Sequence, residues 1–443
     1  MGELKRESEP SPGNGPAVGV VGLGYVGLPL AIQFAKSGAR VLGLDIDPEK
    51  VSAINAGRSY IKHIGSGELK SLVKTGALNA STDFSKVREL EAILICVPTP
   101  LTKNREPDLS FVLQTARQIA PYLQRGTLVV LESTTYPGTT EEDLREALEQ
   151  GSGMRAGVEF HLAFSPERED PGNPASRIDR IPKVVGGFTP ACLEKAVALY
   201  RRVVREVAPV SSCRVAEAAK LLENIFRSVN IALVNELKVV YAAMGVDIWE
   251  VIAAAATKPF GFMPFYPGPG LGGHCIPIDP FYLTWKAREY RQSTRFIELA
   301  GEINTRMPDY VVQRVGEALN ARGKPISGSR ILILGVAYKP DVDDDRESPS
   351  YVLMDLLRLR GAELAYYDPY IPVIRPGREH AHWAGMQSVE WTEETIKSFD
   401  LVLIATHHRA VDYAQLAEWA PCIVDTRNAM ADAPVAPGQV WKA

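Results

Sequence analysis

Short apolar runs alternate with amphipathic stretches in two separate parts of this chain, and that alternation limits the fold more than any other feature. It is typical of βαβ units, which build a parallel sheet with helices on both faces. The runs expected to form buried strands are 17–23, 40–45, 92–97, 127–132 and 160–164 in the first part, and 330–335, 363–367, 401–406 and 422–425 in the second.

The segment between these two parts has a helical pattern. Residues 215–244 contain no Gly or Pro, and apolar residues recur at helical spacing, which predicts one long helix. A Gly/Pro-rich segment, 259–280, and further helix to about Leu319 follow. We therefore predict an α/β protein with two doubly wound Rossmann-like domains joined by a long central helix and a helical middle domain. The expected boundaries are a disordered tail 1–16, then domains 17–210, 211–322 and 323–443.

Composition excludes several classes of function. A formal net charge of −4 gives no overall basic field that would attract nucleic acid or an anionic membrane. No run approaches the roughly 20 apolar residues of a membrane span, and the first fifteen residues lack the apolar core of a signal peptide. Five cysteines without a CxxC pair argue against disulfides and a zinc site, so no metal is expected. We expect a cytoplasmic enzyme or binding protein without nucleic-acid or membrane partners.

The first predicted strand runs into a glycine-rich motif, Gly22-Leu23-Gly24-Tyr25-Val26-Gly27, and then a helix. Glycines at these points permit a tight turn and a close approach of the backbone to a pyrophosphate at the helix N-terminus. Asp45 ends the next strand, where a carboxylate accepts a ribose 2′-hydroxyl and repels a 2′-phosphate. The combination favours NAD over a merely structural turn with Asp45 as a helix cap. Pro98-Thr99 and Ser133-Thr134 follow later strands at the same sheet edge, where ligands bind in such folds.

Two further features point to chemistry. Cys275 lies in a Gly/Pro-dense loop, 268–280, four residues before Asp279, an arrangement that suits a nucleophile with a nearby base. Lys220 and Asn224 are four residues apart on the predicted long helix and could together stabilise an oxyanion. Residue chemistry alone leaves the alternatives open, a small buried side chain for the cysteine and a solvated helix face for the pair.

Taken together, these motifs resemble the UDP-glucose/GDP-mannose dehydrogenase family of NAD-dependent nucleotide-sugar 6-dehydrogenases. The resemblance runs in order from about residue 17 to residue 430. Its motifs are 22–27, Ser165-Pro166-Glu167, Lys220 with Asn224, 272–279, and the run from Tyr338-Lys339-Pro340 to Arg346-Glu347-Ser348-Pro349.

The resemblance implies an N-terminal domain for NAD, a central helix that forms a homodimer interface, and a C-terminal domain for a UDP-sugar. With the glycine motif, it predicts these NAD contacts: Gly22, Gly24, Tyr25, Val26, Gly27, Asp45, Lys50, Pro98, Thr99, Ser133, Thr134 and Arg346. The substrate contacts that it implies are Glu167, Arg168, Lys220, Asn224, Tyr266, Gly270, Gly272, Lys339 and Arg427. The catalytic residues that it implies are Cys275, Lys220, Asn224, Asp279, Glu167 and Thr134.

The family mechanism would oxidise the C6 alcohol to an aldehyde and then, through a thiohemiacetal and a thioester on Cys275, to an acid, with two NADH formed. Lys220 and Asn224 would stabilise the oxyanion, Asp279 and Thr134 would position water, and Glu167 would be an acid/base. The family commonly supplies surface polysaccharide synthesis.

Two positions depart from the UDP-glucose and GDP-mannose branches. Ile278 stands where those enzymes typically have lysine, and Pro171 stands where they carry a second glutamate. Both differences, and the aromatic-rich run 257–277, resemble the branch that acts on UDP-N-acetylhexosamines. UDP-N-acetylglucosamine is the expected substrate, with UDP-N-acetylmannosamine close behind and UDP-glucose as a further alternative.

Readings from other classes remain. A two-electron hydroxyacid or 6-phosphogluconate-type dehydrogenase would share the architecture, would not need Cys275, and would form one NADH per substrate. A non-catalytic NAD-binding protein would bind the cofactor without turnover, since fold alone does not fix function.

Overall fold

The computed structural model describes residues 15–61, 64–102, 104–168, 180–273, 276–377 and 380–443. These residues form two compact units. The first comprises the chain up to Glu223 together with Trp285–Arg291, and the second comprises Asn224–Thr284 and Gln292–Ala443.

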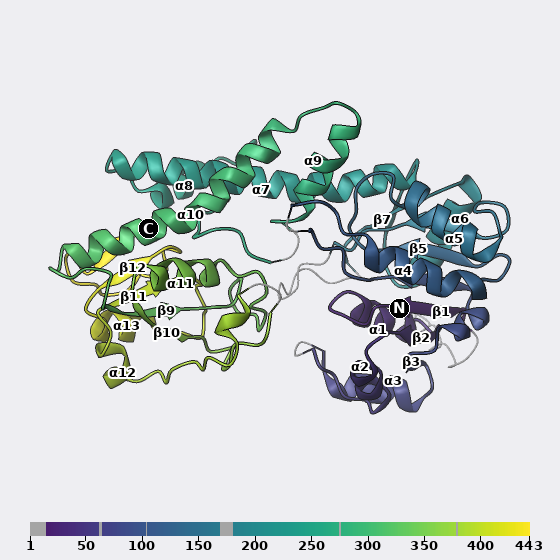
Figure 1. Ribbon diagram of the computed structural model, residues 1–443, viewed down its shortest axis with the longest axis horizontal. Helices are drawn as coiled ribbons and strands as arrows, with labels where there is room; N and C mark the ends of the chain where they lie inside the picture. Colours follow the sequence, from purple (N-terminus) through teal and green to yellow (C-terminus); the bar gives the residue numbers. More distant parts are fainter. Residues whose placement is uncertain (1–14, 62–63, 103, 169–179, 274–275, 378–379) are drawn as a thin grey trace, which may run out of the picture. The chain divides into compact units, whose positions relative to one another are not determined.

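The first unit is built on a sheet of order β3-β2-β1-β4-β5-β6-β7-β8 (Figure 1). Among the described strands, neighbours run parallel except β6 and β7, which are antiparallel. The strands are β1 (Ala17–Val21), β2 (Arg40–Leu44), β3 (Leu78–Ser81), β4 (Ala92–Ile95), β5 (Leu128–Leu131), β6 (His161–Phe164), β7 (Lys183–Gly187) and β8 (Val207–Val210).

Helices cover both faces of this sheet because the strands are apolar on both sides. Leu28 and Phe34 of α1 are buried in the core on one face, and Val112 and Ile119 of α4 in the core on the other. The helices are α1 (Gly27–Lys36), α2 (Pro48–Asn55), α3 (Ser66–Lys74), α4 (Ser110–Ile119), α5 (Arg145–Ser152) and α6 (Pro190–Tyr200).

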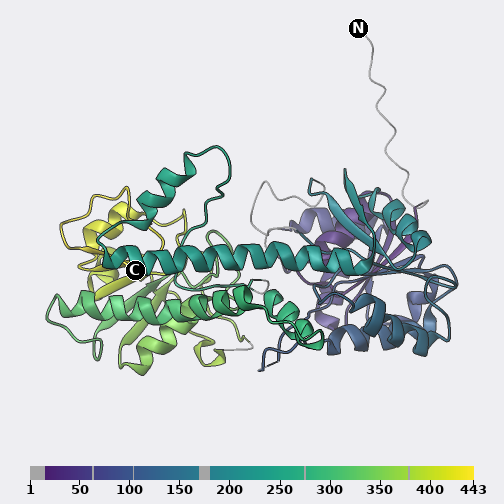
Figure 2. The ribbon, with the colours of Figure 1, turned by 90° about the horizontal axis from the view of Figure 1, so that it is seen from above.

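The long helix α7 (Cys213–Ala243) runs from the first unit into the second, and it ends just before Gly245, which has a left-handed φ of +73°. In the second unit it lies beside α10 (Arg295–Asn320), as Figure 2 shows. Buried amides join the two helices, because Asn235 Nδ2 donates to Asn304 Oδ1 over 2.9 Å and Asn304 Nδ2 donates to the Ser228 carbonyl over 3.2 Å. The remaining helices of this region are α8 (Ile248–Ala256) and α9 (Asp279–Glu289).

The rest of the second unit is a parallel sheet of order β10-β9-β11-β12-β13 between two hydrophobic clusters. Its strands are β9 (Arg330–Leu334), β10 (Glu363–Tyr367), β11 (Leu401–Ile404), β12 (Ile423–Asp425) and β13 (Val440–Lys442), and its helices are α11 (Pro349–Leu359), α12 (Glu393–Lys397) and α13 (Tyr413–Trp419).

The predicted fold class is confirmed, with two Rossmann-like sheets and a helical middle. Each of the nine predicted strands is present and is at most two residues shorter than predicted, and the long helix matches its predicted range closely. The sequence pattern missed β3, β7, β8 and β13, which are short and include polar residues, glycine or proline. Within the described ranges, every helix is too short or too polar to span a lipid bilayer.

Candidate functional site

The turn after β1 depends on glycine at its first position. Gly22 has a φ of +88°, and its N–H donates to the Leu44 carbonyl over 2.8 Å. A Cβ at this position would lie 2.6 Å from the Cys96 carbonyl oxygen. A side chain is therefore excluded both by the backbone conformation and by the adjacent strand end.

The other two glycines of the motif serve different purposes. A Cβ at Gly27 would lie 1.9 Å from the Gly22 carbonyl oxygen, so glycine allows α1 to start tightly against the turn. At Gly24 no described atom lies within 4 Å of the Cβ position, which leaves this side of the turn open to a ligand. Val26 occupies the cap position of α1 and has no polar side chain, so the positive end of the helix is available to a phosphate. Tyr25 packs partly against the core below.

Asp45 is fixed at the end of β2 beside this turn and is 6% exposed. Its two carboxylate oxygens accept from Leu23 N–H over 2.8 Å and from Asp47 N–H over 3.0 Å. Lys50 Nζ lies 3.5 Å from the same carboxylate. Because a carboxylate offers about four acceptor positions, Asp45 retains capacity for a ribose hydroxyl.

A surface pocket of about 490 Å³ opens next to Asp45. It is lined by Asp47, Glu49, Lys50, Ala53, Arg58, Ser59 and Tyr60. The Tyr60 hydroxyl donates to the Leu23 carbonyl, and burial together with Asp45 raises the pKa of Tyr60, so the phenol stays a donor. Sequence reasoning did not identify Tyr60, because no motif links it to a turn 37 residues away.

The loops after β4 and β5 are joined at the same edge of the sheet. Ser133 Oγ donates to the Val97 carbonyl over 2.6 Å, and Thr99 Oγ1 donates to the Thr134 carbonyl over 2.7 Å. The hydroxyls therefore bring Pro98-Thr99 and Ser133-Thr134, which sequence analysis predicted separately, into one polar rim.

Glu167 belongs to a buried ionic cluster. Lys183 Nζ lies 2.7 Å from Glu132 Oε2 and 3.2 Å from Glu167 Oε2, and the Tyr200 hydroxyl also bonds to Glu132. Lys183 is 5% exposed and Glu132 is 2% exposed. The antiparallel direction of β7 puts Lys183, its first residue, at the edge where β5 and β6 end.

This cluster fixes the charge state of Lys183. Burial alone would lower its pKa, but the Glu132 and Glu167 carboxylates outweigh burial and raise it, so the ammonium persists. Lys183 therefore orients the Glu167 carboxylate. The adjacent Arg168 donates to the Pro182 carbonyl over 2.8 Å and pairs with Glu223 over 2.6 Å.

On α7, Lys220 and Asn224 lie one turn apart, as the spacing predicted. Asn224 is 5% exposed, and its Nδ2 donates over 2.6 Å to Asp279 Oδ2 at the start of α9. The structure thus joins two predicted catalytic residues that are 55 positions apart. Cys275 lies outside the described residues.

The Gly/Pro-rich loop that includes residues 266–273 packs closely on the Rossmann-like sheet of the second unit. A Cβ at Gly268 would lie 2.3 Å from a guanidinium nitrogen of Arg427, so a side chain at this position would displace the guanidinium. The Arg427 Nε donates to the Ala405 carbonyl over 3.0 Å, and burial lowers the Arg427 pKa to about 10. Earlier in the loop, Tyr266 stacks on Trp249 with ring centroids 5.6 Å apart.

The later glycines of the loop lie against two other predicted motifs. A Cβ at Gly272 would be 2.8 Å from Pro349 and 3.0 Å from Tyr338, and a Cβ at Gly270 would be 3.1 Å from Pro349. The ammonium of Lys339 lies 5.7 Å from the Tyr338 ring centroid. Predicted substrate residues from three separate segments therefore meet at one edge of this sheet.

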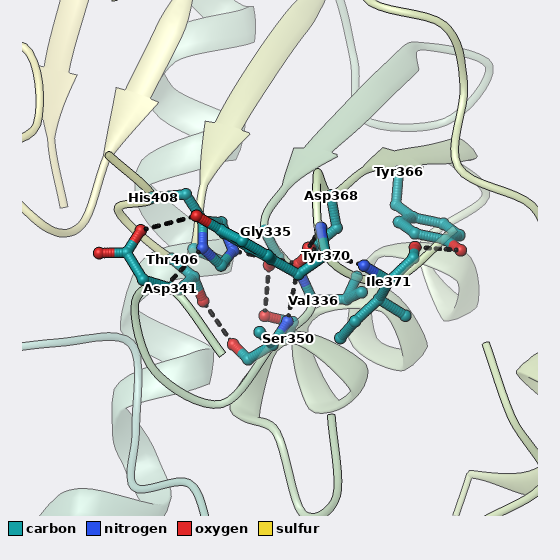
Figure 3. Close-up of polar contacts among 12 residues, drawn as sticks. Gly335, Val336, Asp341, Ser350, Tyr366, Asp368, Tyr370, Ile371, Thr406 and His408 are labelled. Carbon is teal, nitrogen blue, oxygen red and sulfur yellow. Dashed lines mark hydrogen bonds and ion pairs between the residues drawn. The ribbon is translucent and has the colours of Figure 1, made fainter. Parts of the chain in front are cut away.

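A buried network holds the segment that carries Tyr338 and Lys339 (Figure 3). Its centre is Asp368, whose Oδ2 accepts from Val336 and Ala337 N–H over 2.8 and 2.9 Å. His408 Nδ1 accepts from Asp341 N–H over 3.0 Å, so the proton of this imidazole lies on Nε2, which donates to Asp368 over 3.1 Å. The neutral His408 imidazole therefore connects Asp341, at one end of the segment, with Asp368, which binds the other end.

The two Rossmann-like turns are closely similar, but their acidic residues are used differently. Gly335 repeats Gly22, with a φ of +87° and an N–H bond of 2.8 Å to the end of the next strand. Asp368, however, also accepts from the N–H groups of Tyr370 and Ile371. With five donors its acceptor positions are filled, and it cannot receive a ribose as Asp45 can.

Arg346, expected to reach the cofactor, forms a two-point ion pair within the second unit. Its Nε and a terminal nitrogen contact the two Asp344 oxygens over 2.8 and 2.6 Å. A cofactor contact by Arg346 stays a prediction.

Three models of one family match successive parts of the chain. They are the NAD binding domain, the central domain and the UDP binding domain of the UDP-glucose/GDP-mannose dehydrogenase family, at residues 16–204, 214–306 and 332–432. The chain belongs to this family.

Individual members of the family match the chain over most of its length. UDP-N-acetyl-D-glucosamine 6-dehydrogenase of Pseudomonas aeruginosa is 38% identical over 81% of this chain and 82% of its own. UDP-N-acetyl-D-mannosamine dehydrogenase of Pyrococcus horikoshii is 35% identical over 94% and 97%. The solved structure of the UDP-D-ManNAc dehydrogenase from Pyrococcus horikoshii superposes with a TM-score of 0.86 at 34% identity, covering 96% of this chain and 98% of that one.

The protein is therefore an NAD-dependent nucleotide-sugar dehydrogenase. The first unit fits the cofactor, because its turn is open at Gly24 and its Asp45 keeps acceptor capacity. The dehydrogenase also contains structural partners that sequence reasoning missed. None of these partners belongs to a recognisable sequence motif, and the order of the strands places each of them. They are Lys183, Glu132, Asp368 and His408.

Proposed function

We propose that this dehydrogenase oxidises the C6 hydroxyl of UDP-N-acetyl-D-glucosamine to the carboxylate, in a four-electron reaction that forms two NADH. The observation that most supports this proposal is the difference between the two Rossmann-like turns. Asp45 can accept a ribose hydroxyl, whereas Asp368 is filled by five donors, so the two domains suit different ligands. NAD then belongs to the first unit and the UDP-sugar to the second, beside Lys339 and Arg427.

NAD, which the turn at Gly22–Gly27 and Asp45 would hold, would supply the hydride acceptor for each oxidation. In the first, the C6 alcohol loses a hydride and a proton and becomes an aldehyde, and Glu167 is the proposed acid/base. The ammonium of Lys183, 3.2 Å from Glu167, favours the ionised carboxylate, which is the form that accepts a proton. The Cys275 thiolate then adds to the aldehyde carbon and forms a thiohemiacetal, whose second oxidation gives a thioester.

Asn224 suits the stabilisation of the oxyanions in these steps. A primary amide has two N–H donors, and the bond to Asp279 uses one, which fixes the direction of the other. Lys220, one turn away, adds a positive charge. Hydrolysis of the thioester needs water at the same carbon, and Asp279 and Thr134 are proposed to position it, so that the acid leaves and the thiol is restored.

The proposed sugar follows the similarity to the Pseudomonas aeruginosa enzyme and the neutral Ile278. UDP-N-acetyl-D-mannosamine is the second candidate, because the Pyrococcus horikoshii enzyme matches over 94% of this chain. The test is kcat/KM for UDP-GlcNAc, UDP-ManNAc, UDP-Glc and GDP-mannose with saturating NAD. The highest value for UDP-GlcNAc supports the proposal. A preference for another of these sugars overturns the substrate and leaves the reaction type standing.

We also propose that the protein is a homodimer that pairs through α7. Large apolar side chains lie exposed along one stripe of this helix at heptad-like spacing, and they are Leu222, Phe226, Leu233, Val240 and Met244. Such a stripe is unfavourable in water and suits packing against a second copy. Light scattering after size-exclusion chromatography should give twice the chain mass, and Leu233→Lys should reduce it to that of a monomer. A monomeric wild type would contradict this proposal.

A further inference from the structure

Two histidines and an aspartate converge on the surface of the second unit, among residues that the proposed reaction does not use. Asp355 lies on α11, and His380 and His382 lie in the segment that follows β10. His380 Nδ1 is 2.6 Å from one Asp355 oxygen, and His382 Nε2 is 2.6 Å from the other. Three side chains that can ligate a metal ion, from two separate segments, therefore face one another.

The spacing of these donors suits a small divalent ion. One donor atom from each residue lies within 4.8 Å of the other two. Zinc binds imidazole nitrogen and carboxylate oxygen at about 2.0–2.2 Å, so tetrahedral ligands are separated by about 3.3 Å. The two histidine nitrogens each lie 2.6 Å from an Asp355 oxygen, so the three ligand atoms are already close to the separation that such a site needs. The expectation of no metal rested on cysteine spacing, which gives no information on histidine ligands.

The surroundings of Asp355 resemble the support that metal ligands receive. Trp383 Nε1 donates to Asp355 Oδ1 over 2.9 Å, which orients the carboxylate as outer partners do at zinc sites.

Arg358 is the opposing charge, with a guanidinium nitrogen 3.7 Å from Asp355 Oδ1. It is 52% exposed and lies over the Trp383 ring, 4.5 Å from the centroid, so water screens its repulsion of an ion. The ligand side chains are 20–42% exposed, which leaves access for a water molecule as the fourth ligand.

We propose that Asp355, His380 and His382 bind one divalent transition-metal ion of the zinc class. The ion joins α11 to the segment after β10 and so stabilises the second unit. This site is separate from the proposed reaction, because none of its three ligands is among the residues assigned to the cofactor, the substrate or the chemistry.

The test is a titration of chelator-treated full-length protein with Co²⁺ and with Zn²⁺, followed by absorption spectroscopy and calorimetry. One equivalent of Co²⁺ should give the visible bands of a four-coordinate site. It should lack the intense charge-transfer band that a cobalt–thiolate bond gives, which separates this site from any ion bound to cysteine. His382→Gln should lose that equivalent, and His407→Gln, a histidine change in the same domain, should keep it.

Trp383→Phe is the finer variant, because it removes the indole N–H and keeps an aromatic side chain. It should weaken Zn²⁺ binding by about 10- to 100-fold, the usual effect of losing an outer partner. Saturating Zn²⁺ should raise the Tm of the wild type and leave that of His382→Gln unchanged. Absence of a thiolate-free equivalent in the wild type, or its retention in His382→Gln, would overturn the proposal even if another variant failed to fold.

Discussion

Replacing Lys183 by Met should strongly destabilise the first unit, because it leaves Glu132 buried without its counter-ion. Glu132 is 2% exposed, and Lys183 Nζ at 2.7 Å is its cationic partner. Breaking a buried ion pair by removing one member typically costs about 3–5 kcal/mol. For a unit of this size, roughly 2–4 °C per kcal/mol gives a fall in Tm of about 6–20 °C.

The loss should depend on pH in a defined direction. Burial raises the pKa of Glu132, so the folded state holds this proton to higher pH than the unfolded state does. Stability therefore falls as pH rises through the range between the two pKa values, and without Lys183 this fall becomes larger and extends to higher pH. Lys183→Met should lose more stability at pH 8 than at pH 5.

Scanning calorimetry of five proteins tests this reasoning. They are the wild type, Lys183→Met, Glu132→Gln, the double variant, and Lys183→Arg as the charge-conserving control. The double variant should be more stable than Lys183→Met, because the uncompensated charge is gone. A loss below about 1 kcal/mol for Lys183→Met, the range of an exposed pair, would refute the account of a buried cluster.

Two further predictions concern the two nucleotide sites. Gly27→Ala places a methyl group 1.9 Å from the Gly22 carbonyl oxygen, so the KM for NAD should rise at least about tenfold, or the variant should fail to fold. The control Ala31→Gly, in the same helix, should keep the wild-type KM for NAD. An unchanged KM in Gly27→Ala would contradict the packing argument. His408→Phe removes the two side-chain hydrogen bonds by which His408 links Asp341 to Asp368 and so helps to hold the segment of Lys339. The KM for the UDP-sugar should therefore rise by about 10-fold, the effect of roughly 1.4 kcal/mol, with the KM for NAD unchanged. Equal changes in both KM values would indicate general unfolding instead.

The cofactor turn could be predicted from the sequence because its determinants are contiguous. Three glycines, a strand before them and a helix after them specify the turn locally, and Asp45 follows at the end of the next strand. The long helix α7 could be predicted for a similar reason, since a run without Gly or Pro carries its own periodic pattern.

The contacts that hold the functional residues in place could not be predicted, because the residues that make them are far apart in the sequence and only the strand order brings them together. Lys183 reaches Glu132 because β7 runs antiparallel to β6, a reversal that no local pattern indicates. Asp368 is a carboxylate after a strand, as Asp45 is, and only its full set of five donors, which includes His408 40 residues away, shows its different use. Asn224 and Asp279 were predicted as separate catalytic residues from the family resemblance, and their hydrogen bond came from the structure.

The most direct test of the central claim is the amount of NADH formed per molecule of UDP-GlcNAc when the reaction has gone to completion. The proposed thioester route predicts two NADH for the wild type. Calorimetry first checks that Cys275→Ser binds NAD and keeps the wild-type Tm. This variant should then complete no full turnover. One NADH per sugar in the wild type, or full four-electron turnover by Cys275→Ser, would contradict the account.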